Sequence, residues 1–542
     1  MPAKWKNKLY YGDNLVILRE QIPDESVDLV YLDPPFNSNA TYNVLFRAPT
    51  GEASQAQFEA FGDTWHWNET AERAFDEVLT SGNTDASEML RALRIFLKEN
   101  DMMAYLAMMA VRLLELHRVL KPTGSLYLHC DPTASHYLKV LLDAIFGKTN
   151  YLSEIVWRRT NARGTKGKWP RLHDTLLFYS KSKSFYFSRQ MIKGDSAKTP
   201  HTLITGQDGR KYQTYELTGP GRTQDGESGD PWRGFDPNKY GRHWGNSHRQ
   251  MDEWDKEGLI HWPKDGGFPR RLDAVPFDTE QREVVVGTVW TDIDRLNQTA
   301  KERLGYPTQK PIALLERILA ASSNPGDVVL DPFCGCGTTV HAAQKLDRKW
   351  IGIDITHLAV SLIRRRLIDA FPLSQFEVLG VPKDLGGARE LAKADKHQFQ
   401  LWALSMVEAQ PFKGGRKGAD GGVDGYLYFK PDGKIAEKAV VSVKGGGNVG
   451  VAMIRDLIAT IEREGAKIGV FLTLEDPTTT MRREATAAGL YESPMHGKFQ
   501  RIQILTIEDL FGGQKPHLPW IDPSVFRKAK RETSSKQGDL LL

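Results

Sequence analysis

Apolar residues in the first 150 positions alternate between short continuous runs and longer stretches with a helical period. Residues 28–32 and 125–129 are short apolar runs typical of buried strands, whereas residues 105–119 and 136–146 repeat apolar positions as an amphipathic helix does. Strands that alternate with helices in this way are typical of a parallel α/β sheet. The pattern therefore predicts such a sheet within residues 1–150.

The α/β pattern stops after residue 150 and returns near residue 311. Gly and Pro cluster over residues 218–245, and no regular period appears before Val284, which predicts an irregular region over residues 151–305. The returning pattern predicts a helix, a strand, a helix and a strand over residues 312–322, 328–331, 338–346 and 350–354. We expect this second segment, residues 306–382, to complete one sheet with the first.

A further unit is expected in the C-terminal part of the chain. The charged, glycine-containing stretch 383–398 is interpreted as a linker, and a new α/β pattern follows over residues 399–515. Within that pattern we expect strands at 438–444 and 468–473 and a helix at 452–464. The tail 516–542 is polar from Phe526 onward, which predicts disorder.

The composition is that of a globular protein of several domains. The chain has 542 residues, which is too many for one hydrophobic core and predicts about three domains. It contains no run of about 18 uncharged apolar residues and no signal-peptide core near Met1, so no membrane partner is expected. It has three cysteines, Cys130, Cys334 and Cys336. These features predict a cytoplasmic protein in a reducing compartment.

The charge distribution points to nucleic acid more than the net charge of +4 does. Residues 151–190 contain nine Lys or Arg and two acidic residues. Seven of the thirteen tryptophans follow between residues 151 and 300, namely Trp157, Trp169, Trp232, Trp244, Trp254, Trp262 and Trp290. Cations for phosphates beside planar side chains for stacking predict a nucleic-acid partner.

A glycine loop after the predicted strand 327–331 is typical of nucleoside binding. The loop reads Asp331-Pro332-Phe333-Cys334-Gly335-Cys336-Gly337-Thr338-Thr339 and runs into a predicted helix. Glycines let the backbone approach a ligand closely, and Asp354 ends the next strand, where a carboxylate can accept both ribose hydroxyls. A dinucleotide such as NAD is disfavoured, because Val340 stands where the third glycine of that motif would be.

The strand 28–32 ends in Asp33-Pro34-Pro35-Phe36, which predicts a rigid turn that presents hydrogen-bond acceptors. The N6 amine of adenine is a poor nucleophile, because its lone pair is delocalised into the ring. The Asp33 carboxylate and the Pro34 carbonyl could accept its two N–H groups, and Phe36 could stack on the base. An isolated motif of this kind is more often an ordinary turn, so the interpretation depends on its pairing with the glycine loop.

These two motifs resemble the catalytic and cofactor motifs of amino-methylating DNA methyltransferases. Their order along the chain resembles the permuted β group of that family, and the resemblance covers roughly residues 7–375. Further matching segments are Gly12-Asp13-Asn14, Leu120-Lys121-Pro122-Thr123-Gly124, His173-Asp174-Thr175-Leu176-Leu177 and Tyr306-Pro307-Thr308-Gln309-Lys310-Pro311.

The resemblance implies a doubly wound sheet, S-adenosylmethionine as cofactor and double-stranded DNA as partner. It implies a catalytic half in residues 1–150, target recognition in 151–305 and a cofactor-binding half in 306–382. The implied cofactor-binding residues are Asp13, Tyr306, Thr308, Lys310, Asp331, Phe333, Cys334, Gly335, Cys336, Gly337, Thr338 and Asp354. Asp rather than Ser at the first motif position favours adenine, which would be flipped out of the duplex. Cytosine N4 and an RNA substrate stay open.

The segment around Asp424 carries residues suited to phosphodiester hydrolysis. Asp424 follows a glycine-rich run and precedes a strand that ends in Lys444, and Glu408 is expected on the preceding helix. Carboxylates can hold Mg²⁺ and a lysine can stabilise the charge on the phosphorane. We therefore interpret Asp424 and Lys444 as catalytic, and Asp424 and Glu408 as metal ligands.

This segment resembles the Mrr-type restriction endonucleases of the PD-(D/E)xK class. Ser442 stands where that family usually has Glu or Gln, so its metal affinity would be weaker. The resemblance implies a restriction endonuclease domain, and a DNA-binding module without catalysis is the alternative. A DNA-binding protein with an inactive transferase also stays open. The sequence does not fix the oligomeric state, and a homodimer stays open.

Three other clusters are interpreted more simply. His129-Cys130-Asp131 follows a strand without an oriented base and is interpreted as structural. His243, His248 and His261 lack the spacing of zinc ligands, so base or phosphate contacts are expected. The run Arg364-Arg365-Arg366 is interpreted as a solvated helix face.

Overall fold

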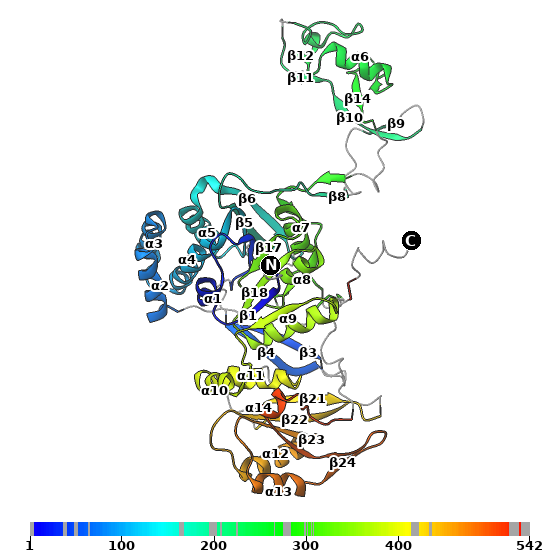
Figure 1. The fold of residues 1–542 in the computed structure, drawn as a ribbon. Coiled ribbons are helices and arrows are strands. Elements are labelled where there is room, and N and C mark those ends of the chain that lie inside the picture. The colour runs from blue at the N-terminus through cyan, green and yellow to red at the C-terminus, as the bar shows by residue number, and fades with distance from the viewer. Residues whose placement is uncertain are drawn as a thin grey trace. The chain divides into compact units, whose positions relative to one another are not determined.

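The computed structural model describes the chain as helices, strands and their connections (Figure 1). It describes residues 5–35, 41–47, 53–62, 66–161, 167, 169–193, 203–205, 209–223, 226–264, 266–274, 283–297, 300, 302–304, 306, 308–412, 422–432, 436–519 and 531–532. Two compact units result, one of residues 1–188 and 288–542 and one of Arg189–Gly287. None of the helices in the described part of the chain combines the length and hydrophobicity needed to cross a membrane.

The first unit is built on a large sheet in which nine described strands lie in the order β16-β6-β7-β5-β2-β17-β18-β1-β19. These strands are β1 (Asn7–Tyr11), β2 (Val27–Leu32), β5 (Leu120–Cys130), β6 (Tyr151–Arg158), β7 (His173–Ser180), β16 (Val289–Trp290), β17 (Val328–Asp331), β18 (Lys349–Asp354) and β19 (Phe376–Leu379). All neighbours are parallel except β7, which runs antiparallel to β5 and β6. Because β2 pairs with β17, the expectation that the two α/β segments complete one sheet is confirmed.

Helices cover both faces of this sheet, so the predicted doubly wound fold is confirmed. Figure 1 shows α4 and α5 on one face and α7, α8 and α9 on the other. The helices are α1 (Asn14–Gln21), α2 (Glu69–Thr80), α3 (Thr84–Leu97), α4 (Asp101–Val119), α5 (Ser135–Leu142), α7 (Ile312–Ser322), α8 (Thr338–Lys345) and α9 (His357–Ala370). Helix α4 begins after Asn100, whose side chain accepts a hydrogen bond from the Met103 amide, and most of its apolar side chains are buried. Three smaller elements complete this part of the unit: the turns Asp143–Gly147 and Lys148–Asn150 and a hairpin of β3 (Thr41–Arg47) and β4 (Ala53–Gly62).

The second unit consists of short strands and one helix around a small aromatic core. Its elements are β8 (Met191–Lys193), β9 (Leu203–Thr205), β10 (Lys211–Glu216), β11 (Thr218–Pro220), a 3₁₀ turn (Pro237–Tyr240), β12 (Arg242–Trp244), α6 (His248–Lys256), β13 (Ile260–His261), β14 (Arg270–Leu272) and β15 (Glu283–Val285). Trp232, Trp244 and Met251 are buried in its core. The irregular region predicted over residues 151–305 is therefore too wide. Residues 151–180 form β6 and β7 of the large sheet, where Leu176 and Tyr179 are buried.

The C-terminal part of the first unit has its own five-stranded sheet in the order β20-β21-β22-β23-β26. Its elements are α10 (Leu385–Ala394), α11 (Lys396–Met406), β20 (Gln410–Pro411), β21 (Gly425–Phe429), β22 (Glu437–Lys444), α12 (Val451–Arg463), β23 (Ile468–Thr473), α13 (Thr479–Ala487), β24 (Leu490–Ser493), β25 (Gly497–Gln500), β26 (Ile502–Thr506) and α14 (Ile507–Phe511). One core lies under α11 and another under α12 and α13, so helices cover both faces. The predicted elements at 438–444, 452–464 and 468–473 are present within one residue at each end.

Two expectations for this part of the chain are corrected. Residues 383–398 are not a linker, because α10 buries Ala388 and Ala392 in the core under α11. Helix α11 ends at Met406, so Glu408 is not on a helix and has a positive φ of 58°. Most of the tail lies outside the described residues, but Glu532 is described and its carboxylate lies 3.5 Å from Lys345.

Candidate functional site

Three aspartates follow neighbouring parallel strands of the large sheet. Asp33 comes directly after β2, Asp331 ends β17 and Asp354 ends β18, and the three strands are adjacent in that order. Because the carboxyl ends of parallel strands meet at one edge of a sheet, the two motifs found in the sequence come together there. This edge is the position at which open α/β sheets bind their ligands.

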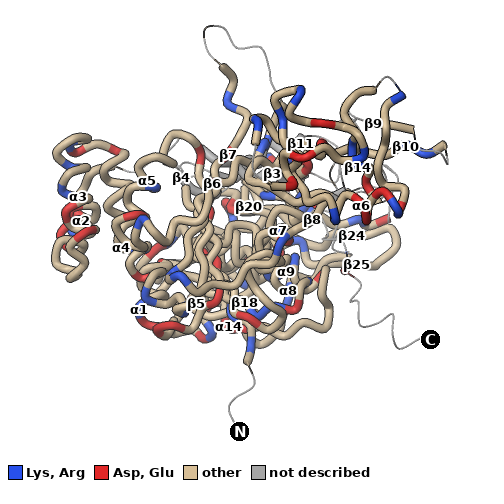
Figure 2. The backbone as a smooth tube through the Cα atoms, turned by 90° about the horizontal axis from the view of Figure 1, so that it is seen from above, with Lys and Arg blue, Asp and Glu red and all other residues tan. Residues whose placement is uncertain are grey.

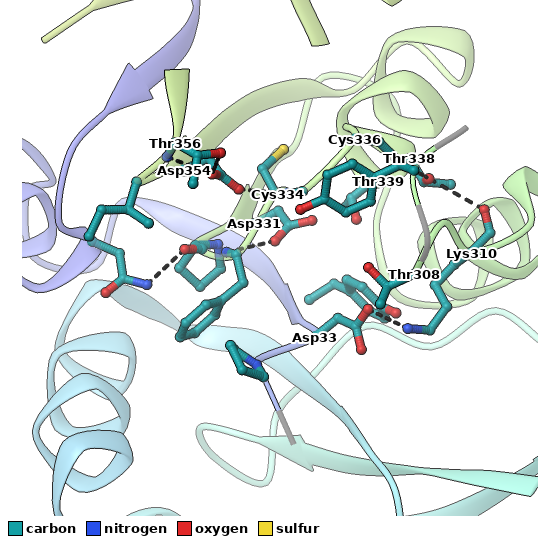
Figure 3. A pocket seen from close by; sticks show the side chains of 18 of the residues that line it. Asp33, Thr308, Lys310, Asp331, Cys334, Cys336, Thr338, Thr339, Asp354 and Thr356 are labelled. Atoms are coloured by element: carbon teal, nitrogen blue, oxygen red, sulfur yellow. Dashed lines mark hydrogen bonds and ion pairs between the residues drawn. The ribbon is translucent and has the colours of Figure 1, made fainter. Parts of the chain in front are cut away.

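A cavity of about 270 Å³ opens at this edge, as Figure 3 shows. Of the residues expected at the methyl-transfer and cofactor sites, those that line it are Asp13, Asp33, Pro35, Tyr306, Thr308, Lys310, Asp331, Phe333, Cys334, Gly335, Cys336, Thr338 and Asp354. Pro34 is buried, and Gly337 precedes the first residue of α8. Phe36 and Pro307 lie outside the described residues.

The loop between β17 and α8 presents backbone to the cavity. Gly335 and Gly337 have φ angles of 53° and 77°, in the left-handed region that favours glycine. The Gly335 amide donates a hydrogen bond of 2.8 Å to Oδ2 of Asp354, which ties the loop to the end of β18. A Cβ at Gly337 would lie 2.8 Å from Ile363 of α9, so close packing also requires glycine there. The loop is therefore held in place while its backbone stays open to a ligand.

Burial raises the proton affinity of Asp331 and Asp354. It raises the pKa of Asp331 to about 7 and that of Asp354 to about 6. Oδ1 of Asp354 accepts hydrogen bonds of 2.9 Å from both the amide and the hydroxyl of Thr356. Oδ1 of Asp331 accepts one of 3.0 Å from the Phe333 amide. Both carboxylates are thus fixed acceptors that can orient the hydroxyl groups of a nucleoside.

The third aspartate, Asp33, forms an ion pair with Lys310 (Figure 3). Oδ2 of Asp33 accepts the hydrogen bond from Nζ of Lys310. Its other oxygen, Oδ1, is buried and has no hydrogen-bond partner among the described residues. A buried acceptor without a partner is costly in a folded protein, which makes this oxygen a candidate to receive an N–H group from a ligand. Lys310, expected to bind the cofactor, thus pairs with the carboxylate of Asp33, which was expected to be catalytic.

The turn after β1 joins the same cavity through a buried arginine. Arg112 of α4 donates hydrogen bonds of 2.7 Å to Asn14 and 3.1 Å to Asp13. Asn14 in turn donates one of 2.8 Å to the carbonyl of Pro332 in the glycine loop. Asp13 also caps α1 by accepting from the Leu15 amide. Asp13 therefore lines the cavity and anchors its wall at the same time.

Arg366, which the sequence analysis placed on a solvated helix face, is buried beneath the glycine loop. Its guanidinium donates to the carbonyl of Cys336 at 3.0 Å and to the hydroxyl of Thr338 at 3.1 Å. It is 2% exposed, so the solvated interpretation is wrong for this residue. The signal was its spacing, because Arg366 follows the apolar positions 359 and 363 along one face of α9.

The cluster His129-Cys130-Asp131 has a structural environment, in agreement with the sequence interpretation. His129 is fully buried, with Nδ1 2.8 Å from the Tyr31 hydroxyl and Nε2 3.3 Å from Asp174. Burial raises the pKa of the Cys130 thiol well above its ordinary value, so this thiol stays protonated. Nucleophilic chemistry is therefore not expected at Cys130.

The connection between β6 and β7 leaves the sheet at the edge that carries Asp33. Leu32 of β2 pairs with Leu128 of β5, and Cys130 at the end of β5 pairs with Thr175 at the start of β7. Between residues 158 and 172 the sequence has six Lys or Arg and no acidic residue. Trp169 within this connection is 94% exposed. The described part of this connection, which includes Arg159, Trp169 and Arg171, thus stands at the same edge as the cavity.

The structure does not support the expectation that the tryptophans and basic residues together form a nucleic-acid surface over residues 151–300. Four of the seven, Trp157, Trp232, Trp244 and Trp290, are at most 5% exposed and serve as core residues. Residues 189–287 contain 15 Lys or Arg and 16 Asp or Glu, and α6 carries both kinds of residue (Figure 2). His243 lies 3.0 Å from the carbonyl of Gly221. The basic character therefore resides in the connection between β6 and β7, not in the second unit.

A second polar cluster lies in the C-terminal sheet, at the beginning of β21 and the end of β22. Asp424 is 6% exposed, and its Oδ2 accepts a hydrogen bond of 2.6 Å from the Val443 amide. Its Oδ1 accepts one from the amide of Gln400 on α11. Ser442 and Lys444 are two residues apart on β22, so they share one face of the sheet. The structure thus brings Asp424 close to the end of β22 that carries Lys444.

Glu408, expected to share a metal with Asp424, lies among basic side chains instead. Its carboxylate is 3.6 Å from Arg365 of α9 and 3.9 Å from Lys515. Gln400 is the polar neighbour of Asp424 that the sequence analysis missed. The signal was a polar side chain between Phe399 and Leu401 in a strongly apolar stretch of helix. Among the described residues no group of three or more His, Cys, Asp or Glu converges as a metal site.

The doubly wound sheet, the glycine loop and the acidic cavity define a nucleoside-binding α/β enzyme. Residues 27–365 match the model of the DNA methylase family, and the chain belongs to that family. Residues 391–504 match a restriction endonuclease family, which confirms a methylase fused to an endonuclease-like domain. Both assignments agree with the resemblance drawn from the sequence motifs.

Several known proteins align with most of the length of this chain. The type II methyltransferase M.EcaI of Enterobacter cloacae is 28% identical over 400 residues, which is 72% of this chain and 76% of the relative. The DNA adenine methyltransferase YhdJ of Escherichia coli K12 is 25% identical over 387 residues, 70% of this chain and 90% of the relative. A crystal structure of the M1.HpyAVI–SAM complex is 15% identical, with a TM-score of 0.29, and covers 66% of this chain and 99% of that one.

Proposed function

We propose that this methylase transfers a methyl group from S-adenosylmethionine to the N6 amine of adenine in double-stranded DNA. The observation that carries the proposal is the buried Oδ1 of Asp33, which has no partner among the described residues and borders the cavity. An amine that becomes a nucleophile gains positive charge, and a carboxylate acceptor stabilises that charge. The relative YhdJ is a DNA adenine methyltransferase, which supports adenine over cytosine.

The residues of the cavity suit this cofactor. Asp354 would accept the ribose hydroxyls, and the segment of Tyr306, Thr308 and Lys310 would line the methionine end. When bound, the cofactor supplies the methyl group as a sulfonium, a cation that four cavity aspartates would attract. Asp13, Asp33, Asp331 and Asp354 are these four.

Asp33 and its neighbours orient the target amine. Oδ1 of Asp33 accepts one N–H of the amine, and the Pro34 carbonyl accepts the other, so that the nitrogen lone pair points towards the methyl donor. Lys310 holds the second carboxylate oxygen, so the acceptor is fixed before the base arrives. The base must leave the duplex to reach Asp33, because the amine inside a stacked pair is inaccessible.

The basic connection between β6 and β7 lies at this edge of the sheet and is proposed to contact DNA. Its cations would neutralise phosphates, and Trp169 would occupy the space that the flipped base leaves in the stack. The second unit, Arg189–Gly287, would then choose the target sequence. Its balanced charge fits a role in base recognition better than a role in phosphate binding.

Transfer of a labelled methyl group to unmethylated bacterial DNA, followed by nucleoside analysis, tests the proposal. Wild type should yield N6-methyladenine, and Asp33→Ala should reduce the yield by at least about a hundredfold, because the acceptor is lost. Asp85→Ala is a matched control, since Asp85 is an exposed aspartate in the first turn of α3. N4-methylcytosine as the product would transfer the same mechanism to the other amine, and no labelled nucleoside would overturn the proposal.

The C-terminal domain is proposed to cleave DNA with Mg²⁺. Asp424, the amide oxygen of Gln400 and the Ser442 hydroxyl are oxygen ligands suited to this ion. Lys444 follows Ser442 on the same face of β22 and would stabilise charge on the phosphate. Wild type should cut unmethylated plasmid in Mg²⁺, and Asp424→Ala should not. Ser442→Glu should cut faster, because it adds a carboxylate where the hydroxyl is a weak ligand.

A DNA-binding domain without cleavage is the second candidate. It is favoured by the two hydrogen bonds that Asp424 accepts from Gln400 and Val443, which engage both carboxylate oxygens. In that case plasmid stays intact in Mg²⁺ with wild type, while Lys444→Ala still weakens DNA binding in a mobility-shift assay. Methyl transfer should be retained in every one of these C-terminal variants.

A further inference from the structure

A small buried cluster joins the endonuclease-like domain to the wall of the methylase cavity. It consists of Tyr306, Cys336 and Leu401, each at most 5% exposed, with Leu358 and Leu362 of α9 packed against them. Tyr306 and Cys336 line the cavity. Leu401 belongs to α11, which lies inside the region that matches the restriction endonuclease family. One domain therefore supports the cofactor site of the other.

The contact around this cluster is a packed interface with polar groups at its margin. Asp395 caps the beginning of α11. Burial raises the pKa of the Tyr11 phenol to about 12, and the negative charge of Asp395 contributes to this rise. Tyr11 stacks on His357 of α9 with ring centroids 3.5 Å apart. Just beyond the end of α11, Glu408 lies 3.6 Å from Arg365 of α9. Polar groups at both ends of α11 thus face the methylase part of the first unit.

Tyr306 is held between this interface and the glycine loop. A Cβ at Gly335 would lie 3.4 Å from its ring, so the ring lies over the loop that presents backbone to the cavity. Thr308 and Lys310 follow within four residues of Tyr306 and line the same cavity. A side chain that lacks one packing partner gains freedom and loses dispersion contacts. Truncation of Leu401 would therefore loosen Tyr306 and the cavity segment that follows it.

We propose that Leu401 is a positioning residue for the cofactor site, so that the endonuclease-like domain sets the affinity of the methylase for S-adenosylmethionine. This inference rests on the proposed cofactor. The next residue before Leu401 is Gln400, whose amide holds Asp424. Consecutive residues of α11 thus contact the methylase cavity and the Asp424 cluster. Because coupling between sites is reciprocal, cofactor binding should in return stabilise α11 and the surroundings of Asp424.

Titration calorimetry of the full chain with S-adenosylmethionine, without DNA, tests the proposal. Leu401→Ala should weaken binding by about tenfold, because part of the lost packing is expressed as cofactor affinity. Leu401→Met should restore most of the affinity, since it keeps the volume of the side chain. Leu404→Ala is the matched control, because Leu404 is a fully buried leucine of the same helix that packs in the core of the C-terminal domain.

Kinetics and hydrogen exchange give two readouts that a general loss of stability would not move. With Leu401→Ala, KM for the cofactor should rise while kcat at saturating cofactor stays within about twofold of wild type. In wild type, addition of the cofactor should slow amide exchange in α11 and at Val443 of β22. Unchanged affinity in Leu401→Ala, or equal losses in Leu401→Ala and Leu404→Ala, would overturn the proposal. Cofactor binding without methyl transfer would overturn the proposed function and leave this inference standing.

Discussion

The three cavity aspartates at the ends of β2, β17 and β18 are chemically alike but differ in their surroundings. Asp33 has a cationic partner in Lys310, whereas burial raises the pKa of Asp331 to about 7 and of Asp354 to about 6. Identical side chains can thus serve as an amine acceptor in one place and as hydroxyl acceptors in the others. Two predictions separate these roles.

Cofactor affinity should rise with pH through the window from about 5.5 to 7.5. An aspartate whose pKa is raised in the folded protein keeps its proton up to that pH. Between about pH 4 and the raised pKa, this aspartate makes the folded protein less stable as pH rises. A bound sulfonium favours the ionised forms of Asp331 and Asp354, so binding should release protons in this window. Calorimetry at pH 6.5 in two buffers of different ionisation enthalpy measures the release, and equal enthalpies with constant affinity would contradict the prediction.

Lys310→Met should lower kcat more than it raises KM for the cofactor. The substitution removes the cation that holds Oδ2 of Asp33, so the acceptor loses its orientation and the transition state loses about 2–4 kcal/mol of stabilisation. Initial rates of methyl transfer at varied cofactor concentration measure both constants. Lys345→Met is the control, because Lys345 does not line the cavity and forms an ion pair of 2.8 Å with Glu316. A rise in KM alone would instead assign Lys310 to cofactor binding.

The direction of one strand decides at which edge of the sheet the basic connection between β6 and β7 lies. Because β7 runs antiparallel to β5, the connection points to the edge where the parallel strands end. If β7 were parallel to β5, the same basic residues would enter from the opposite edge. Its placement at the edge that carries Asp33 therefore depends on the direction of a single strand.

Trp169→Ala should slow methylation of a fully paired target by about ten- to a hundredfold. Removal of the side chain leaves the space of the flipped base unfilled, at a cost of about 1–3 kcal/mol. The loss should be much smaller on a target adenine placed opposite a mismatched base, because extrusion then costs less. Single-turnover methylation of the two duplexes measures the difference.

Leu373→Ala is the matched control for Trp169→Ala. Leu373 is 93% exposed and lies between α9 and β19, at the edge opposite to Asp33. The Leu373→Ala variant should methylate both duplexes as wild type does. Equal losses of Trp169→Ala on paired and mismatched DNA would assign Trp169 to general DNA binding instead.

The chain as a whole carries a methylase and an endonuclease-like domain in contact through α11. If both are active, DNA methylated by the wild type should resist cleavage by the same enzyme, while DNA incubated with Asp33→Ala and cofactor should stay sensitive. The reason is that only the first reaction changes the amine that recognition reads. Plasmid pre-incubated with each protein, purified and then treated with wild type in Mg²⁺ provides the comparison on a gel. Cleavage of both plasmids to the same extent would show that the two activities do not share a target.

Local patterns along the chain were sufficient for the elements and the motifs. The strands that end at Asp331 and Asp354 and the helix 312–322 were predicted nearly to the residue, because hydrophobic period and glycine punctuation are local properties. The family followed from two short motifs for the same reason, since turns that bind nucleosides or present acceptors are built from neighbouring residues.

The tertiary structure decided what depends on contacts between residues far apart. It buried Arg366 and four of the seven tryptophans, moved Glu408 away from Asp424 and placed Gln400 there. It also turned a predicted linker into α10 and packed Leu401 of α11 against Tyr306 and Cys336, which line the cavity. No local pattern contains these facts, because burial, ion pairing and domain contact depend on the whole arrangement of the chain, whereas periodicity depends only on neighbours.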